Sequence, residues 1–171
     1  MTDQQLGQDL IWTCRSAGAG IVGITHEGQP VSGGSVLLTI SGLESTFGQQ
    51  RLFARLEAGY AKGGHYYLRS PEVRKLWATY GCLAACSYGA FQLMFVTATE
   101  LGFDGHPVDL QTDTTCAYWA AQLISRRIIK AQGATTLAQV LDGYNSGSSR
   151  DENVPEAYIA KGISLYNSLK L

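Results

Sequence analysis

Short apolar stripes with helical spacing, separated by glycines, constrain this chain's fold more than any other feature. In residues 35–45, apolar side chains recur at intervals of three and four, which places them on one face of a helix. These side chains are Val36, Ile40 and Leu43. Gly48 marks the exit of this helix, and strand-like alternation is poor throughout the chain. The pattern predicts a mainly α fold of short helices joined by glycine-rich loops.

Capping residues locate further helices. Ser70-Pro71-Glu72 combines an N-cap serine, a first-turn proline and an acid near the positive end of the helix dipole. Thr136 with Gln139 fits a capping box, and Asp113 is the expected N-cap of a helix that ends before Gly133. We therefore expect helices over residues 5–15, 70–79, 88–101, 113–132 and 136–144, and a last one from about residue 153 with a stripe of Ile159, Ile163 and Tyr166; residues 16–20 and 29–34 are expected to be loops.

Length and charge exclude several classes of protein. The chain has 171 residues, the length of one domain, and a net charge of −1. No basic run is longer than Arg126-Arg127, so we expect no nucleic-acid partner. No apolar stretch reaches the roughly 18 residues of a membrane span. The first residues, with Asp3 among them, lack the basic start of a secretory signal. Charged residues are only 16%, and a surface rich in uncharged hydrogen-bonding groups suits a carbohydrate.

The four cysteines are too few and too scattered for a disulfide-rich scaffold. They are Cys14, Cys82, Cys86 and Cys116. Cys82 and Cys86 lie four residues apart, and the sequence leaves their disulfide state open. Neither His65 nor His106 completes a Cys/His metal spacing. We expect buried free thiols, with no metal and no cofactor.

Glu44 is the strongest catalytic candidate. It follows Ile40 by four residues and Leu37 by seven, so its carboxylate projects from the apolar stripe of its own helix. Desolvation and the carbonyl end of the helix both favour the protonated acid and raise the pKa of Glu44. A carboxylic acid that stays protonated near neutral pH suits a general acid. The alternative is a glutamate that reaches water past Thr46 and Gly48.

Two further segments combine amides with aromatic residues. In residues 87–94, Gln92 is placed to orient a ligand from an apolar helix; the alternative is an ordinary core helix with one exposed amide. In residues 144–147, a tyrosine and an asparagine precede a glycine, which alone is typical of a helix C-cap.

Taken in order, these segments resemble the lytic transglycosylase family, the lysozyme-like SLT domain that cleaves peptidoglycan. The corresponding segments here are Glu44-Ser45-Thr46-Phe47, Gly89-Ala90-Phe91-Gln92-Leu93-Met94, Gly143-Tyr144-Asn145-Ser146-Gly147 and Pro155-Glu156-Ala157-Tyr158. Residues 51–57 and 97–103 also resemble segments of bacteriophage-type members. The resemblance spans about residues 35–169. It implies a mainly α, lysozyme-like single domain over 35–171 with a two-lobed helical cleft. Residues 1–34 have no counterpart in the family, and we expect them to form an N-terminal extension packed on this domain.

The resemblance also implies roles for individual residues. Glu44 is the single catalytic acid and base, and the implied substrate-binding residues are Ser87, Gln92, Met94, Tyr144 and Asn145. Ser45 and Glu57 are expected to support the site from behind. Leu83 and Cys86-Ser87 depart from the family, which often has Ser and Gly-Ala there, so a sugar contact from this loop rests on Ser87 alone.

The segment between Glu44 and Gln92 is long and aromatic. Its side chains are expected either to form a wall or lid of the sugar groove or to pack in the core. They are Tyr60, His65, Tyr66, Tyr67 and Trp77.

The count of carboxylates bears on the reaction. A glycoside hydrolase ordinarily needs two acids beside the bond. Between Glu44 and Asp104 the only acids are Glu57, Glu72 and Glu100, and the last two are expected on helix surfaces. The expected reaction is therefore single-acid cleavage between N-acetylmuramic acid and N-acetylglucosamine, giving 1,6-anhydro-muramyl ends. A hydrolytic muramidase and a non-catalytic glycan-binding module remain the alternatives.

The same resemblance implies where the protein works. The implied partners are peptidoglycan strands, and the chain acts at the bacterial cell wall as a monomer or as part of a larger phage or secretion assembly. Without a recognisable signal peptide, it is expected to be phage-associated or exported by another route.

Overall fold

The computed structural model describes residues 8–49, 54–149 and 156–169, and this part of the protein is mainly helical, as predicted. The α-helices are α2 (Gln8–Gly18), α3 (Gly33–Ser45), α4 (His65–Arg69), α5 (Pro71–Tyr80), α6 (Phe95–Glu100), α7 (Asp113–Gln122), α8 (Leu137–Ser146) and α9 (Glu156–Leu169). Two short 3₁₀ helices, η1 (Gly81–Ala85) and η2 (Pro107–Gln111), and a π-helical continuation of α7, η3 (Leu123–Ala131), complete the helical part.

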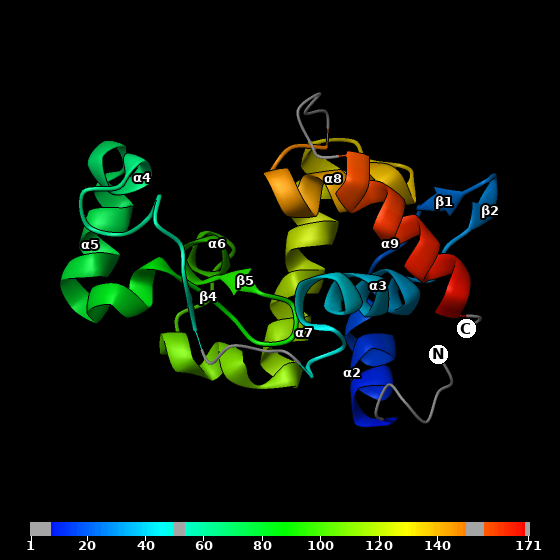
Figure 1. The fold of residues 1–171 in the computed structure, drawn as a ribbon, viewed down its shortest axis with the longest axis horizontal. Helices are drawn as coiled ribbons and strands as arrows, with labels where there is room; N and C mark the ends of the chain where they lie inside the picture. The colour runs from blue at the N-terminus through cyan, green and yellow to red at the C-terminus, as the bar shows by residue number, and fades with distance from the viewer. Residues whose placement is uncertain (1–7, 50–53, 150–155, 170–171) are drawn as a thin grey trace.

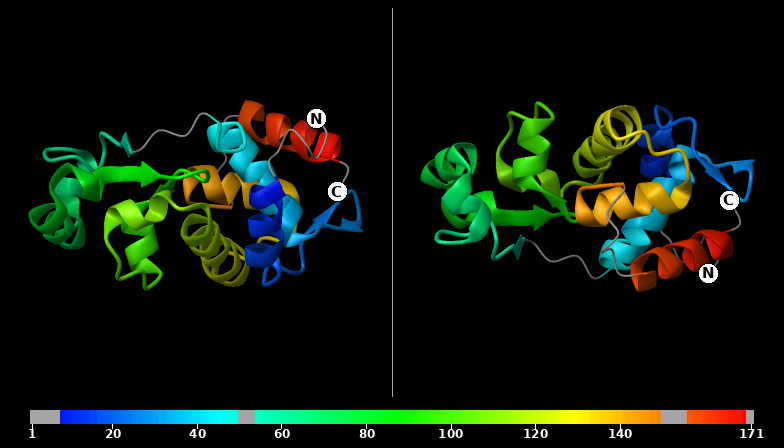
Figure 2. Two further views of the ribbon diagram at one scale, coloured as in Figure 1. Left: turned by 90° about the horizontal axis from the view of Figure 1, so that it is seen from below. Right: turned by 90° about the horizontal axis from the view of Figure 1, so that it is seen from above.

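The helices form two groups with α7 between them (Figure 1). One group holds α4, α5 and α6, and the other holds α2, α3, α8 and α9; the views from below and above show the same division (Figure 2). α2 packs against α3 and α7, whereas α9 packs against α3 and α8. Residues 8–34 share the core of the rest of the chain, because Leu10, Ile11 and Cys14 belong to the same buried cluster as α3.

α3 is the most deeply buried helix of this arrangement. Val36, Leu37, Leu38 and Ile40 have no exposed surface, so the helix is covered on nearly every side rather than on one stripe. Burying a side chain of this size contributes about 1.5–3 kcal/mol. The continuous run of buried residues ends at Ser41, and in the last turn Gly42, Leu43 and Glu44 are half-buried while Ser45 is buried again. The last turn of α3 therefore lies at the edge of the core.

The helix predicted over 88–101 is wrong in its first half. Residues 86–94 form a hairpin of β4 (Cys86–Tyr88) and β5 (Leu93–Met94), and only α6 is helical. β4 also pairs with β3 (Arg55–Leu56), and both pairings are antiparallel. Gly89 and Gln92 have positive φ angles of 68° and 45°, which a helix does not accept. Gln92 therefore lies at a hairpin turn, not on a helix.

Other boundaries also differ from the predictions. α2 extends through residues 16–18, which were predicted as loop, and Gly18 lies so close to Gly33 that no β-carbon fits between them. Within the predicted loop 29–34, Gln29–Pro30 forms β2, which pairs with β1 (Thr25–His26), and α3 begins at Gly33. Residues 5–7 and 153–155 of the first and last predicted helices lie outside the described residues.

Two of the three capping predictions are confirmed. Ser70 accepts a hydrogen bond from the Val73 N–H at the start of α5, which ends one residue later than predicted. Thr136 and Gln139 form the predicted capping box of α8. Thr112, rather than Asp113, is the N-cap of α7.

Among the described helices, none combines the length and hydrophobicity that crossing a membrane requires.

Candidate functional site

A cavity of about 320 Å³ opens where the two groups of helices meet. The end of α3, the segment around β3, the β4–β5 hairpin, η3 and the end of α8 each contribute to its wall. Six residues predicted for the site line it: Glu44, Glu57, Gln92, Met94, Tyr144 and Asn145. Elements far apart in the sequence thus bring the predicted residues to one place.

Glu44 lies half-buried in the last turn of α3. Tyr158 of α9 donates a hydrogen bond to Glu44 Oε1 at 2.6 Å. Burial raises the pKa of Glu44 above its ordinary value, while the Tyr158 hydrogen bond and the positive charge of Arg55 act in the opposite direction. The environment of this side chain therefore favours the protonated carboxyl group more than that of a solvated surface glutamate does.

The turn between β4 and β5 is held by three side chains. Ser45, which is buried, donates to the carbonyl of Ala90 at 2.6 Å, and Tyr144 of α8 donates to the carbonyl of Phe91 at 2.9 Å. The side-chain amide of Gln92 donates to the carbonyl of Gly89 at 2.8 Å. Ser45 is absent from the cavity wall but fixes the turn that carries Gln92.

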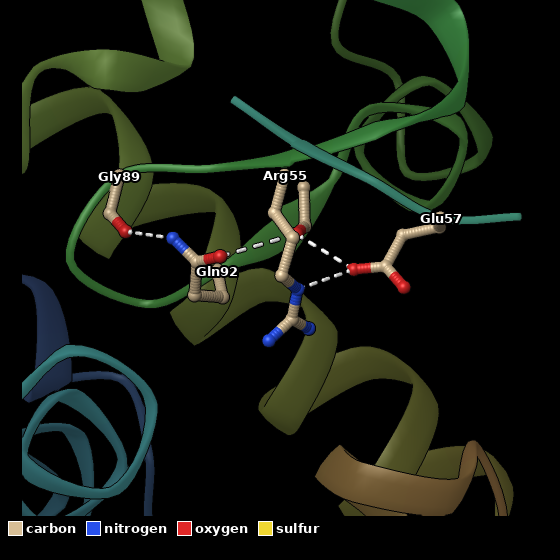
Figure 3. Close-up of polar contacts among 5 residues, drawn as sticks. Arg55, Glu57, Gly89 and Gln92 are labelled. Atoms are coloured by element: carbon tan, nitrogen blue, oxygen red, sulfur yellow. Dashed lines mark hydrogen bonds and ion pairs between the residues drawn. The ribbon is translucent and has the colours of Figure 1, made fainter. Parts of the chain in front are cut away.

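Glu57 forms a second polar cluster in the cavity (Figure 3). Its Oε1 accepts from Arg55 Nε at 2.7 Å and from the Ser87 hydroxyl at 2.9 Å. The β3–β4 register explains the arrangement, because Arg55 lies directly opposite Ser87. Ser87 is 1% exposed and does not line the cavity, so it reaches the site only through Glu57 and through Gln92 Oε1, 3.2 Å away.

The aromatic residues of the segment before the hairpin divide into two sets. Tyr60 and Tyr66 line the cavity, and their rings stack with centroids 4.4 Å apart. His65 packs edge-on against Tyr66, and Tyr67 packs edge-on against Trp77. His65, Tyr67 and Trp77 are not part of the cavity wall.

Several residues of the cavity wall were not predicted, chiefly Arg55, Thr97, Leu123 and Arg127. Arg127 pairs with the exposed Glu100 at 2.8 Å. Arg55 and Thr97 lie in the segments 51–57 and 97–103 that resemble the family, but neither was predicted to line the site. Arg55 owes its position to the pairing of β3, a two-residue strand that carries almost no sequence signal.

None of the four cysteines lines the cavity. All four are free thiols; Cys14, Cys86 and Cys116 are buried as expected, but Cys82 is exposed, contrary to the prediction, because it lies on the outer side of η1. Cys86 donates its S–H to the carbonyl of Cys82 at 3.2 Å. Within the described segments, no group of three or more histidine, cysteine, aspartate or glutamate side chains is placed to hold a metal ion.

Comparisons with protein-family models, with curated proteins and with solved structures gave no match for this chain.

Proposed function

We propose that this protein is a peptidoglycan lytic transglycosylase of lysozyme-like fold. It cleaves the bond between N-acetylmuramic acid and N-acetylglucosamine with Glu44 as acid and base. The observation that carries the proposal is a half-buried carboxyl group with a raised pKa in the wall of a cavity that also presents amide and aromatic side chains. The order of the sequence motifs that resemble the SLT domain supports the same assignment.

The proposed reaction needs one carboxylic acid. Glu44 protonates the glycosidic oxygen, and the acetamido oxygen of the muramyl residue attacks the anomeric carbon as the leaving sugar departs. The Glu44 carboxylate then removes the proton of the 6-hydroxyl group, whose oxygen displaces the acetamido oxygen and closes the 1,6-anhydro ring. Glu44 ends the cycle protonated. Because Tyr158 occupies Oε1, the proton is carried by Oε2.

Gln92 and Tyr144 act mainly by shaping the site. Their polar groups bind the carbonyls of the hairpin turn, so the wall beside Glu44 is preorganised before substrate arrives. Met94 and the exposed Asn145 line the same cavity and are the proposed direct sugar contacts, with the Tyr60–Tyr66 pair at another part of the wall.

One observation favours a second candidate, a hydrolytic muramidase. Glu57 shares the cavity with Glu44, and its Oε1 accepts hydrogen bonds from Arg55 and Ser87. A pair of carboxyl groups beside the bond is what a glycoside hydrolase ordinarily uses. In that case water, rather than the 6-hydroxyl group, completes the reaction.

The proposed place of action is the bacterial cell wall, with peptidoglycan strands as partner. The protein works there as a monomer or within a phage or secretion assembly. The place of action and the partner both follow from peptidoglycan as the proposed substrate.

Digestion of purified peptidoglycan tests the proposal. Fragments from the unaltered protein, from Glu44→Gln and from the control Glu72→Gln, an exposed glutamate on α5, are compared by mass spectrometry and a reducing-end assay. Anhydro-muramyl ends that disappear only in Glu44→Gln support the transglycosylase. Reducing ends with the same dependence identify the muramidase, and wall binding without any fragments identifies a non-catalytic module.

A further inference from the structure

We infer that Arg55 forms a subsite for a carboxylate of the substrate strand and selects anionic muramyl strands over neutral amino-sugar strands. The inference rests on the proposed function and names the substrate class of the same cavity.

The Arg55 side chain is fixed by a chain of contacts that begins in the core. Ser87 is buried in β4 and donates to Glu57 Oε1, and the same oxygen accepts from Arg55 Nε at 2.7 Å. Only Nε is used in this contact. Within the part of the chain that the structure describes, neither terminal nitrogen of Arg55 has a hydrogen-bond partner. Figure 3 shows these nitrogens pointing away from the Glu57 carboxylate.

An arginine held in this way is prepared to bind a carboxylate. The guanidinium group has five N–H donors in one plane, and four of them remain on the two terminal nitrogens. Two of these donors match the two oxygens of a carboxylate. The side chain is 48% exposed and lines the cavity, so a solute reaches it without rearrangement of the fold.

The charges around the cavity also favour an anion. Four ionisable side chains of the glutamate and arginine types line it: Glu44, Glu57, Arg55 and Arg127. With Glu44 protonated, as the proposed reaction requires, the lining carries two cations and one anion. Both arginines keep unused donors, since Arg127 directs only one nitrogen to the exposed Glu100; Arg55 is the one of the two whose positive charge acts on Glu44.

The substrate offers such a carboxylate from two sources. In bare strands, each N-acetylmuramic acid carries a free lactyl carboxylate. In peptide-bearing strands the lactyl group is an amide, and the carboxylates are on the peptide. Strands of N-acetylglucosamine alone have neither, so binding at Arg55 distinguishes the two kinds of glycan.

The test measures binding to the Glu44→Gln protein, so that no turnover occurs. Three tetrasaccharides of alternating N-acetylglucosamine and N-acetylmuramic acid serve as probes: one with free lactyl carboxylates, one with these groups converted to methylamides, and one bearing peptides. Each is titrated calorimetrically into Glu44→Gln, into Glu44→Gln with Arg55→Gln, and into Glu44→Gln with Arg126→Gln. Arg126 is exposed on η3 and outside the cavity wall, which makes it the matched control.

We expect Arg55→Gln to weaken binding of a carboxylate-bearing probe by about tenfold or more, since a hydrogen bond to a charged group is worth at least about 1.4 kcal/mol. Binding of the methylamide should change by less than about twofold, and Arg126→Gln should change neither. Whether the lactyl or the peptide-bearing probe responds identifies the source of the carboxylate.

Equal binding of the carboxylate and methylamide probes to Glu44→Gln overturns the inference even if the Arg55 variant is unstable. Equal weakening of all probes by Arg55→Gln overturns it as well. In both cases cleavage of peptidoglycan by the unaltered protein leaves the proposed function standing. Absence of both binding and cleavage refutes the two together.

Discussion

Replacement of Gly89 by alanine tests the hairpin turn on which the site depends. Gly89 has a φ of 68°, and a residue with a β-carbon loses about 1–2 kcal/mol in the left-handed region. A β-carbon there lies 2.6 Å from the Leu110 carbonyl oxygen and 2.9 Å from Cys116 Sγ, and such overpacking costs about a further 1–3 kcal/mol. We expect Gly89→Ala to lower the free energy of unfolding by about 2–5 kcal/mol.

Gly28→Ala is the matched control. Gly28 lies in the β1–β2 hairpin turn with a φ of 76°, but nothing lies within 4 Å of an added β-carbon. Only the backbone cost of about 1–2 kcal/mol applies to it. Urea unfolding followed by circular dichroism gives both values, provided that the denaturant dependence is unchanged. Equal losses in the two variants contradict the claim that close packing at Gly89 holds the turn.

Three further predictions concern Glu44 and its neighbours. Because burial raises the pKa of Glu44, the protonated side chain contributes stability at low pH, and this contribution is lost as the pH rises through the raised pKa. Glu44→Gln should therefore lose less free energy of unfolding than the unaltered protein as the pH rises above the ordinary glutamate value of 4.5, measured by urea unfolding. Tyr158→Phe removes a hydrogen bond that lowers the same pKa, so the alkaline limb of the pH–rate profile should move to higher pH, while Tyr166→Phe on the same helix leaves it in place. Ser45→Ala leaves the buried Ala90 carbonyl without its side-chain donor and should cost about 1–3 kcal/mol in thermal or urea unfolding; a loss within the error of the measurement argues against that contact.

Local sequence chemistry predicted the helices whose ends are set by short-range hydrogen bonds. α5 and α8 begin where Ser70 and Thr136 accept bonds from N–H groups three residues later, an interaction that depends on neighbours alone. The β4–β5 hairpin was missed because a short buried apolar run is compatible with either a helix or a strand. Contacts with residues distant in sequence determine that this segment forms strands, since β3 pairs with β4 and Gly89 packs against Leu110.

The same distinction applies to the site. Glu44 was predicted from helical spacing, and the structure places it half-buried at the end of α3, beside the cavity. Its hydrogen bond with Tyr158 joins residues 114 apart, which spacing within one helix cannot predict. Arg55 was missed for a related reason, because its orientation follows from strand register and from Glu57 rather than from a motif.

The hairpin turn also has a mechanical consequence. α3 and α8 approach the cavity from different directions, yet Ser45 and Tyr144 tie both helices to adjacent carbonyls of the same turn. Spreading these two helices apart breaks at least one of those bonds, so the turn works as a spacer that sets the width of the gap beside Glu44. By contrast, α4 and α5 bury only Val73. Adjustment of the cavity to ligands of different bulk is therefore expected on the α4–α5 side, while the wall formed by α3, α8 and the hairpin turn stays in place.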